Sequence, residues 1–263
     1  MEIKFKSNPY NSSNINITKS DVLNILKKLD IQDYNIKDLS LFQQSFIHNS
    51  YCNNPIYEEY DKPNNCLSLF NKSYETLESI ISQYLYNRFT KYHNQNEGFL
   101  TKLKIRFVCG EQLAYLSKKL NFGKFIVISK HTEDNCDGRE SQNILEDVFE
   151  AFLGALFLDS NDNKLIEKFI INCIETYIDI IDLILNDNNY KDQLLRYFQH
   201  NYLVHPKYKT IKDEDKNLFV SNINRYDDNN NCINVSKGFG KTKKKSEQDA
   251  AKNALILYSV ISK

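Results

Sequence analysis

The spacing of apolar residues changes once along this chain of 263 residues, at the polar segment NDNNYKD (186–192). Before that segment, apolar residues recur three and four positions apart, which places them on one face of a helix. After it, runs of β-type composition stand between two helical stretches. The two periods require different elements, so the chain is expected to divide into an all-α part and an α+β part. We predict the boundary between residues 186 and 187.

Each part has a definite expected order of elements. In the first part, a domain over 20–186 that follows an N-terminal extension (1–19), helices are predicted at about 20–50, 67–89, 97–120, 144–158 and 164–185. In the second part, 187–263, a helix at 190–201 precedes strands at 207–211, 218–223 and 232–239, and a helix over about 246–260 follows. The predicted fold class is a multidomain one, with an all-α domain joined to an α-β-β-β-α domain.

Charge is distributed unevenly, although the whole chain is neutral with 34 basic and 34 acidic residues. Residues 190–263 hold 14 Lys and Arg against 8 Asp and Glu, whereas residues 1–189 hold 20 against 26. The second part therefore has a cationic excess that the first part lacks. Such an excess indicates a polyanionic partner for the second part.

Composition and segment lengths argue against several classes of protein. A hydrophobic fraction of 41% is typical of a globular chain and argues against disorder. The longest apolar run, AFLGALFL (151–158), is far shorter than the roughly 18 residues that a membrane span needs. The N-terminus has no apolar signal core, and the six cysteines are scattered without a C-x-x-C pair. We expect an intracellular protein with no membrane partner, disulfide framework or cysteine zinc site.

The segment GFGKTKKKSEQDAAKNAL places four lysines, Lys241, Lys243, Lys244 and Lys245, at the start of the last predicted helix. The free N–H groups at a helix start and the helix dipole already favour an anion. A duplex nucleic acid releases counterions when such a cluster neutralises its phosphates. A solvated run of charges is the alternative, and the segment by itself leaves both interpretations open.

The predicted helix NILEDVFEAFLGALFLD (143–159) is apolar on nearly every face except at Asp147 and Glu150, which are three residues apart. Asn143 and Glu146 fit a capping box at its start. Carboxylates on a largely buried helix need a metal, a basic partner or a raised pKa. Adjacent carboxylate oxygens suit Mg²⁺ or Mn²⁺, so Asp147 and Glu150 are candidate metal ligands. Structural ion pairs with lysine or arginine are the alternative.

The element order and the run KKKSEQDAAKNAL resemble the double-stranded-RNA-binding domain over residues 190–262. The resemblance implies that the lysine cluster spans a major groove while the first helix, with Arg196, and the first strand loop touch minor grooves. The chain has Leu195-Arg196 where this family usually has Gln-Glu, and Asp215 where it usually has His. The acidic loop at 212–217 would be repelled by phosphate, which implies weaker binding than is usual in the family.

The helix ILEDVFEAFLGALFLD resembles the second acidic motif of ribonuclease III, in which residues at the positions of Asp147 and Glu150 hold catalytic magnesium. Residues 96–126 resemble that family's central helix pair and place Glu97 at an acidic family position close to the metal site. The opening helices also match, so the resemblance covers about 20–262 in family order. It implies a Mg²⁺-dependent endoribonuclease that hydrolyses double-stranded RNA and leaves 5′-phosphate and 3′-hydroxyl ends.

The first acidic motif of that family, E-R-L-E-F-L-G-D, is altered in this chain. An ungapped match anchored on LYNRF places LSLFNKSY (67–74) there, so that Phe70 and Tyr74 replace two metal ligands. A gapped match to YETLES recovers Glu75 and Glu78 but deletes about two turns of helix. A third match, YEEYDKPNN, would put a proline inside the helix. We adopt the ungapped match.

A two-metal phosphodiester site needs several carboxylates, so the ungapped match predicts that Asp147 and Glu150 hold one ion weakly. Two functions remain open on this basis. One is metal-dependent cleavage of double-stranded RNA, and the other is an inactive RNA-binding or scaffold subunit. Asn71 replaces the motif's Phe at the family's usual homodimer contact, so the expected protein partner is either a second copy or an intact paralogue.

Overall fold

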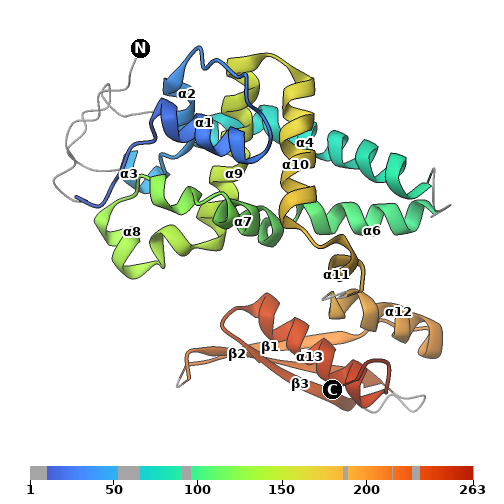
Figure 1. Cartoon of the computed structure of the whole chain (residues 1–263). Coiled ribbons are helices and arrows are strands. Elements are labelled where there is room, and N and C mark those ends of the chain that lie inside the picture. Colours follow the sequence, from blue (N-terminus) through green and yellow to red (C-terminus); the bar gives the residue numbers. More distant parts are fainter. Residues whose placement is uncertain are drawn as a thin grey trace. The chain divides into compact units, whose positions relative to one another are not determined.

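The computed structural model describes residues 11–52, 66–90, 96–185, 189–214, 216–226 and 232–262 (Figure 1). The chain divides into two compact units, residues 1–183 and 184–263. The first unit is helical and the second contains the sheet, as the change of period predicts. Over the described ranges, none of the helices is both long and apolar enough to span a membrane.

The helical unit begins with three helices whose starts are capped by side chains or packed on the core. They are α1 (Lys19–Lys28), α2 (Leu39–Ser45) and α3 (Asn49–Cys52). Thr18 caps α1, because its hydroxyl accepts from the N–H of Asp21 at 3.2 Å and the Asp21 carboxylate accepts from the N–H of Thr18 at 3.0 Å. This reciprocal capping box fixes where α1 starts.

The remaining helices of this unit include the apolar helix α9, on which several of the others pack. They are α4 (Phe70–Leu85), α6 (Glu97–Val108), α7 (Gly110–Lys119), α8 (Lys130–Asn135), α9 (Gln142–Ser160), α10 (Asn163–Tyr177) and α11 (Ile180–Leu185). Single turns of 3-10 helix lie at Cys66–Leu69, Phe122–Phe125 and Gly138–Glu140, and a π-helical turn at Tyr86–Thr90 follows α4. Helices α2, α4, α7 and α10 all pack on α9.

Aromatic side chains form the centre of this core. The ring of Phe152, on α9, lies 5.5 Å from that of Phe42, 4.9 Å from that of Phe122 and 5.6 Å from that of Phe169. All four side chains are buried. Burial of each such ring stabilises the fold by roughly 1.5–3 kcal/mol, so α9 is held on several sides at once.

The predicted N-terminal extension joins this core in its second half. The Asn11 side chain donates to the carbonyl of Ile128 at 2.9 Å, and that of Asn14 donates to the same oxygen at 3.0 Å. Arg139 in turn donates to the Asn14 side chain at 3.0 Å, and Ile17 is buried. Residues 11–17 are therefore part of the helical unit, whereas residues 1–10 lie outside the described residues.

The second unit has the predicted α-β-β-β-α order. Its elements are α12 (Tyr190–Tyr202), β1 (Lys207–Asp213), β2 (Leu218–Tyr226), β3 (Cys232–Gly240) and α13 (Lys243–Leu257). The strands form one antiparallel sheet in the order β1-β2-β3. Helix α13 lies across one face of that sheet (Figure 1).

Small residues allow α13 to approach the sheet closely. A Cβ added at Gly238 would lie 2.0 Å from the backbone nitrogen of Ala250, and one at Gly240 would lie 2.5 Å from that of Ser246. The core between helices and sheet consists of Leu194, Phe198, Ile223, Ala250, Ala251, Ala254 and Leu255. The direct contact between β3 and α13 fixes the position of the turn that joins them.

Candidate functional site

Helix α9, most of whose buried side chains are apolar, carries the half-buried carboxylates of Asp147 and Glu150. Burial, and then the negative charge of Glu146, raises the pKa of Asp147 to about 6. Burial, and then the charges of Glu146 and Asp147, raises the pKa of Glu150 to about 7. Neither carboxylate has a hydrogen bond or ion pair within the described part of the chain. Structural ion pairs within the described residues therefore do not explain why these charges lie on α9.

Glu146, which the sequence suggested only as a capping residue, is a charged neighbour of this pair. The predicted capping box of Asn143 and Glu146 is wrong, because α9 starts earlier, at Gln142, and Ser141 is its N-cap residue. The Glu146 carboxylate instead lies over Gly110 at the start of α7, where an added Cβ would be 2.0 Å from its Oε2. Glu146 thus contributes more than mutual repulsion between Asp147 and Glu150 to the raised pKa values.

The stripe of α9 that carries these carboxylates faces the beginning of α4. Gly154 lies about one turn beyond Glu150 on the same side of the helix. A Cβ added at Gly154 would be 2.4 Å from the carbonyl oxygen of Leu69, directly before α4. Asp147 and Glu150 therefore point along the side on which α4 begins.

Of the other candidate carboxylates, Glu78 and Glu97 are described, and neither joins this pair in a group that could hold a metal ion. Glu78 makes an ion pair with Lys104 of α6 at 3.2 Å. Glu97 is exposed in the first turn of α6. The side chains of Phe70, Tyr74 and Glu75 lie outside the described residues. The catalytic role of Glu97 and the ungapped match of the first motif both stay predictions.

The metal-binding capacity of the described residues is small. They contain no group of three or more His, Cys, Asp or Glu side chains arranged to hold a metal ion. Within the described ranges, Asp147 and Glu150 are two carboxylates without hydrogen-bond donors, and Mg²⁺ accepts one or two protein carboxylates together with waters and substrate phosphate. The pair therefore fits one weakly held divalent ion.

The first turn of α13 presents the predicted lysine cluster to solvent. Lys241, Lys243, Lys244 and Lys245 are all exposed. Thr242 caps the helix, since its hydroxyl accepts from the N–H of Lys245 at 3.2 Å. Four ammonium groups thus stand at the positive end of a helix of 15 residues, which is an arrangement suited to phosphate.

The other predicted phosphate contact is occupied by a neighbour. Arg196 of α12 makes an ion pair with Asp192 at 3.0 Å, and both side chains are largely exposed. In the loop between β1 and β2, Lys212 pairs with Glu214 at 3.2 Å, and Asp215 lies outside the described residues. Exposed pairs of this kind are weak, so Arg196 can exchange Asp192 for a phosphate.

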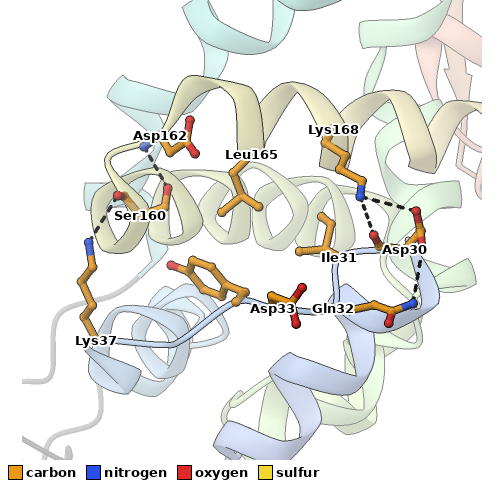
Figure 2. Close-up of a pocket in the computed structure, with 10 residues that line it drawn as sticks. Asp30, Ile31, Gln32, Asp33, Lys37, Ser160, Asp162, Leu165 and Lys168 are labelled. Carbon is orange, nitrogen blue, oxygen red and sulfur yellow. Dashed lines mark hydrogen bonds and ion pairs between the residues drawn. The ribbon is translucent and has the colours of Figure 1, made fainter.

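A surface cavity of about 520 Å³ in the helical unit lies apart from both sites (Figure 2). Lys168 donates to the carbonyl of Asp30 at 2.6 Å on one side, and Lys37 donates to that of Ser160 at 3.3 Å on the other. Beside the cavity, the buried Asp159 accepts from the N–H groups of Lys37 and Asp38 at 3.1 and 2.6 Å. Asp159, near the end of α9, therefore holds the backbone of the segment before α2 in place through hydrogen bonds.

Two family models match this chain in order. The ribonuclease III domain matches residues 75–161, which include Asp147, Glu150 and Glu97. The double-stranded RNA binding motif matches residues 190–258, which include the lysine cluster and Arg196. The fold and its two charged sites therefore define a nuclease-type helical domain followed by an RNA-binding domain.

Relatives along most of the chain have the same combination. Ribonuclease 3 of Borreliella burgdorferi is 32% identical over 244 residues, which are 91% of this chain and 92% of that protein. Ribonuclease 3 of Streptococcus gordonii is 36% identical over 83% of this chain and 89% of its own length. A probable ribonuclease 3 of Acanthamoeba polyphaga mimivirus is 37% identical over 85% of this chain, which spans 39% of that longer protein. The chain belongs to the ribonuclease III family.

A solved nuclease-domain structure matches part of this chain. The nuclease domain of ribonuclease III from Campylobacter jejuni covers 59% of this chain with a TM-score of 0.48 and 25% identity. The two matched domains and the named relatives together support a double-stranded-RNA-binding endoribonuclease.

Proposed function

We propose that this chain cleaves double-stranded RNA slowly, using one divalent ion held by Asp147 and Glu150. The observation that carries the proposal is this pair of half-buried carboxylates, which have no hydrogen bond or ion pair within the described part of the chain. Half-buried, uncompensated carboxylates cost stability unless a cation or a proton joins them. A site kept at such a cost on the central helix of the domain is a candidate for function.

The residues of the chain have separate tasks in this proposal. Lys243, Lys244 and Lys245 bind the duplex backbone, while Asp147 and Glu150 hold the ion through their oxygens. A bound Mg²⁺ or Mn²⁺ ion would polarise the scissile phosphate and supply an activated water. With two protein carboxylates in place of the several that a two-metal site needs, affinity for the ion and turnover are both low.

The test is cleavage of long duplex RNA by the purified full chain in Mg²⁺ and in Mn²⁺. We expect weak cleavage that is lost in Asp147→Asn while duplex binding is kept. Asp134→Asn is the matched control, because Asp134 is an exposed carboxylate of the same unit that pairs only with Lys130 at 2.9 Å among the described residues. Cleavage that survives Asp147→Asn would contradict the proposal.

Metal binding can be followed without activity. A ligand that binds only the folded state adds RT ln(1 + [L]/Kd) to stability. Millimolar Mg²⁺ or Mn²⁺ should therefore raise the melting temperature of the wild type. The double variant Asp147→Asn with Glu150→Gln should lose this response.

An inactive RNA-binding subunit is the second candidate. It is favoured by the lack, among the described residues, of a third side chain arranged to hold a metal with Asp147 and Glu150. Duplex binding without cleavage in either metal ion, and without a thermal shift on metal addition, would support it.

The protein partner also belongs to this proposal. We favour a second copy of the chain over an intact paralogue, because twofold homodimers are the commonest assemblies of soluble proteins. The mass of the purified chain in solution, measured by light scattering, decides between a monomer and a dimer.

A further inference from the structure

The sheet of the second unit has one face against α13 and one that no described element of this unit covers. The Ser221 hydroxyl lies 2.8 Å from that of Ser246, and Ser236 donates to the carbonyl of Ala250 at 2.8 Å, so these side chains point to α13. Successive side chains of a strand point to opposite faces. Val220 and Asn222, beside Ser221, and Lys237, after Ser236, therefore line the opposite, outer face.

Strand register places two contrasting rows on this outer face. One row is apolar, because Ile211 of β1 pairs with Val220 of β2 and Val220 pairs with Phe239 of β3. Ile211 is 57% exposed and Phe239 is 49% exposed. The neighbouring row consists of Lys209, Asn222 and Lys237 in the same register. An exposed aromatic ring thus lies next to a row with a lysine at each end.

Lys209 and Lys237, the two lysines of this row, have no carboxylate partner in the described part of the chain. The ammonium group of Lys237 lies 5.2 Å from the ring centroid of Phe239. The Asp249 carboxylate accepts from the backbone N–H of Phe239 at 2.8 Å and so lies at the edge of β3. Asp213, at the end of β1, accepts from the N–H of Lys216 at 3.2 Å. Positive charge is therefore unbalanced on the two rows themselves.

We propose that this outer face binds single-stranded RNA, with an unpaired base stacked on Phe239 and backbone phosphates beside Lys209 and Lys237. A cationic surface with an exposed aromatic ring is the combination that binds single strands, since every base offers a face for stacking. Bases within a duplex are already stacked and cannot reach such a ring. A second copy of the same face is disfavoured because its lysines would repel these.

This surface is distinct from the proposed duplex site. The duplex site lies in the first turn of α13, on the covered side of the sheet, whereas Phe239 and Lys237 point away from α13. The cationic excess of the second part is thus divided between two surfaces. The single-strand surface rests on the outer-face residues alone and is independent of cleavage.

The experiment measures binding of a fluorescent oligouridine of about 15 nucleotides to the full chain by anisotropy, in EDTA and at low salt. Phe239→Ala should weaken binding about tenfold, which is the size of one lost stack of a base on an aromatic ring. Phe239→Leu, which keeps an apolar side chain, should weaken it similarly. The double variant Lys209→Gln with Lys237→Gln should weaken it and flatten its dependence on salt.

A duplex of the same length is the control ligand. All three outer-face variants should bind it within twofold of the wild type, which also shows that the second unit is folded. The triple variant Lys243→Ala, Lys244→Ala and Lys245→Ala should lose duplex affinity and keep most of its affinity for oligouridine.

Three outcomes would overturn the proposal. Unchanged oligouridine affinity in Phe239→Ala and in the lysine double variant would exclude the face as the binding site. Normal affinity in Phe239→Leu together with weak affinity in Phe239→Ala would indicate apolar contact without stacking, as a docked protein segment requires. A lower mass in solution for Phe239→Ala than for the wild type would assign the face to self-association.

Discussion

Asp147 and Glu150 are half-buried on a helix whose buried side chains are mostly apolar, whereas Lys243, Lys244 and Lys245 are exposed to solvent on the first turn of α13. At Asp147 and Glu150, desolvation changes the proton affinity of the carboxyl groups, and removal of a charge there affects the stability of the fold. At the lysine cluster, the charges have almost no effect on the stability of the fold, and they act through counterion release. The two clusters should therefore respond differently to mutation, to pH and to salt.

The largest expected effect is on the exposed cluster. Replacement of Lys243, Lys244 and Lys245 by Ala should weaken duplex RNA binding at least about tenfold and reduce the slope of log affinity against log salt. The melting temperature should stay within about 2 °C, because all three side chains are exposed. Titration with duplex RNA at several salt concentrations measures both. An unchanged salt slope would show that the lysines do not touch phosphate.

The packing of α9 near Asp147 and Glu150 can be disturbed without a change to either carboxylate. Gly154→Ala places a methyl group 2.4 Å from the backbone oxygen of Leu69, so the start of α4 must shift away from α9. Overpacking of this kind costs about 1–3 kcal/mol. Gly98→Ala is the control, since the nearest atom to its added Cβ is a side-chain oxygen at 3.5 Å. A chemical denaturation series should show a loss for Gly154→Ala and none for Gly98→Ala.

The pH dependence of stability separates the two clusters further. A carboxyl group whose pKa is raised in the folded state stabilises the fold at low pH and loses this contribution as pH rises. In EDTA, Asp147 and Glu150, with pKa values of about 6 and 7, should therefore cost about 1–2 kcal/mol between pH 5 and pH 8, after allowance for solvent at half-buried groups.

The control for this pH effect is the double variant Asp147→Asn with Glu150→Gln, which should be as stable as the wild type or slightly more so at pH 8. His48 acts in the opposite direction over the same range, because burial lowers its pKa and favours folding as pH rises. The difference between wild type and double variant removes the contribution of His48. A large loss of stability in the double variant at pH 8 would show that the carboxylates hold structural ion pairs instead.

The smallest expected effect concerns Arg196. Arg196→Ala should lower duplex affinity by less than about threefold, because the guanidinium already has a partner in Asp192 and exposed pairs are weak. Asp192→Asn should leave affinity equal or slightly raised, since it frees Arg196 for phosphate. A loss of tenfold or more in Arg196→Ala would show that α12 is as important for binding as the lysine cluster.

The elements of the second unit could be predicted well from the sequence, whereas the helices predicted at 97–120 and 164–185 are each divided in two. The three strands begin at the predicted residues, Lys207, Leu218 and Cys232, because turn-forming residues mark those starts. They extend one to three residues beyond the predicted ends, since backbone pairing continues through polar residues such as Asp213. Helix α13 begins earlier than predicted, at Lys243, because Thr242 provides a cap that the lysine run conceals.

Contacts between distant parts of the chain could not be predicted in this way. Asn11 reaches the carbonyl of Ile128 across 117 residues, so residues 11–17 had no local sign of joining the core. Glu146 lies against Gly110 of another helix, and this tertiary contact replaces the local capping role that the sequence suggested. The pattern identified Asp147 and Glu150 as neighbours, but their environment depends on packing that a period of 3.6 does not specify.

The two glycines of β3 have a consequence for how this domain can diverge. Gly238 and Gly240 meet the backbone of α13 directly, and any side chain there would displace the helix. Lys237 and Phe239 alternate with them and point to solvent, so substitutions at those positions leave the helix contact intact. Within one strand, therefore, alternate positions differ in the substitutions that their packing permits. The side chains at the outward positions can therefore change, and with them the ligand that the outer face binds. The packing of β3 against α13, which positions the lysine cluster, stays the same.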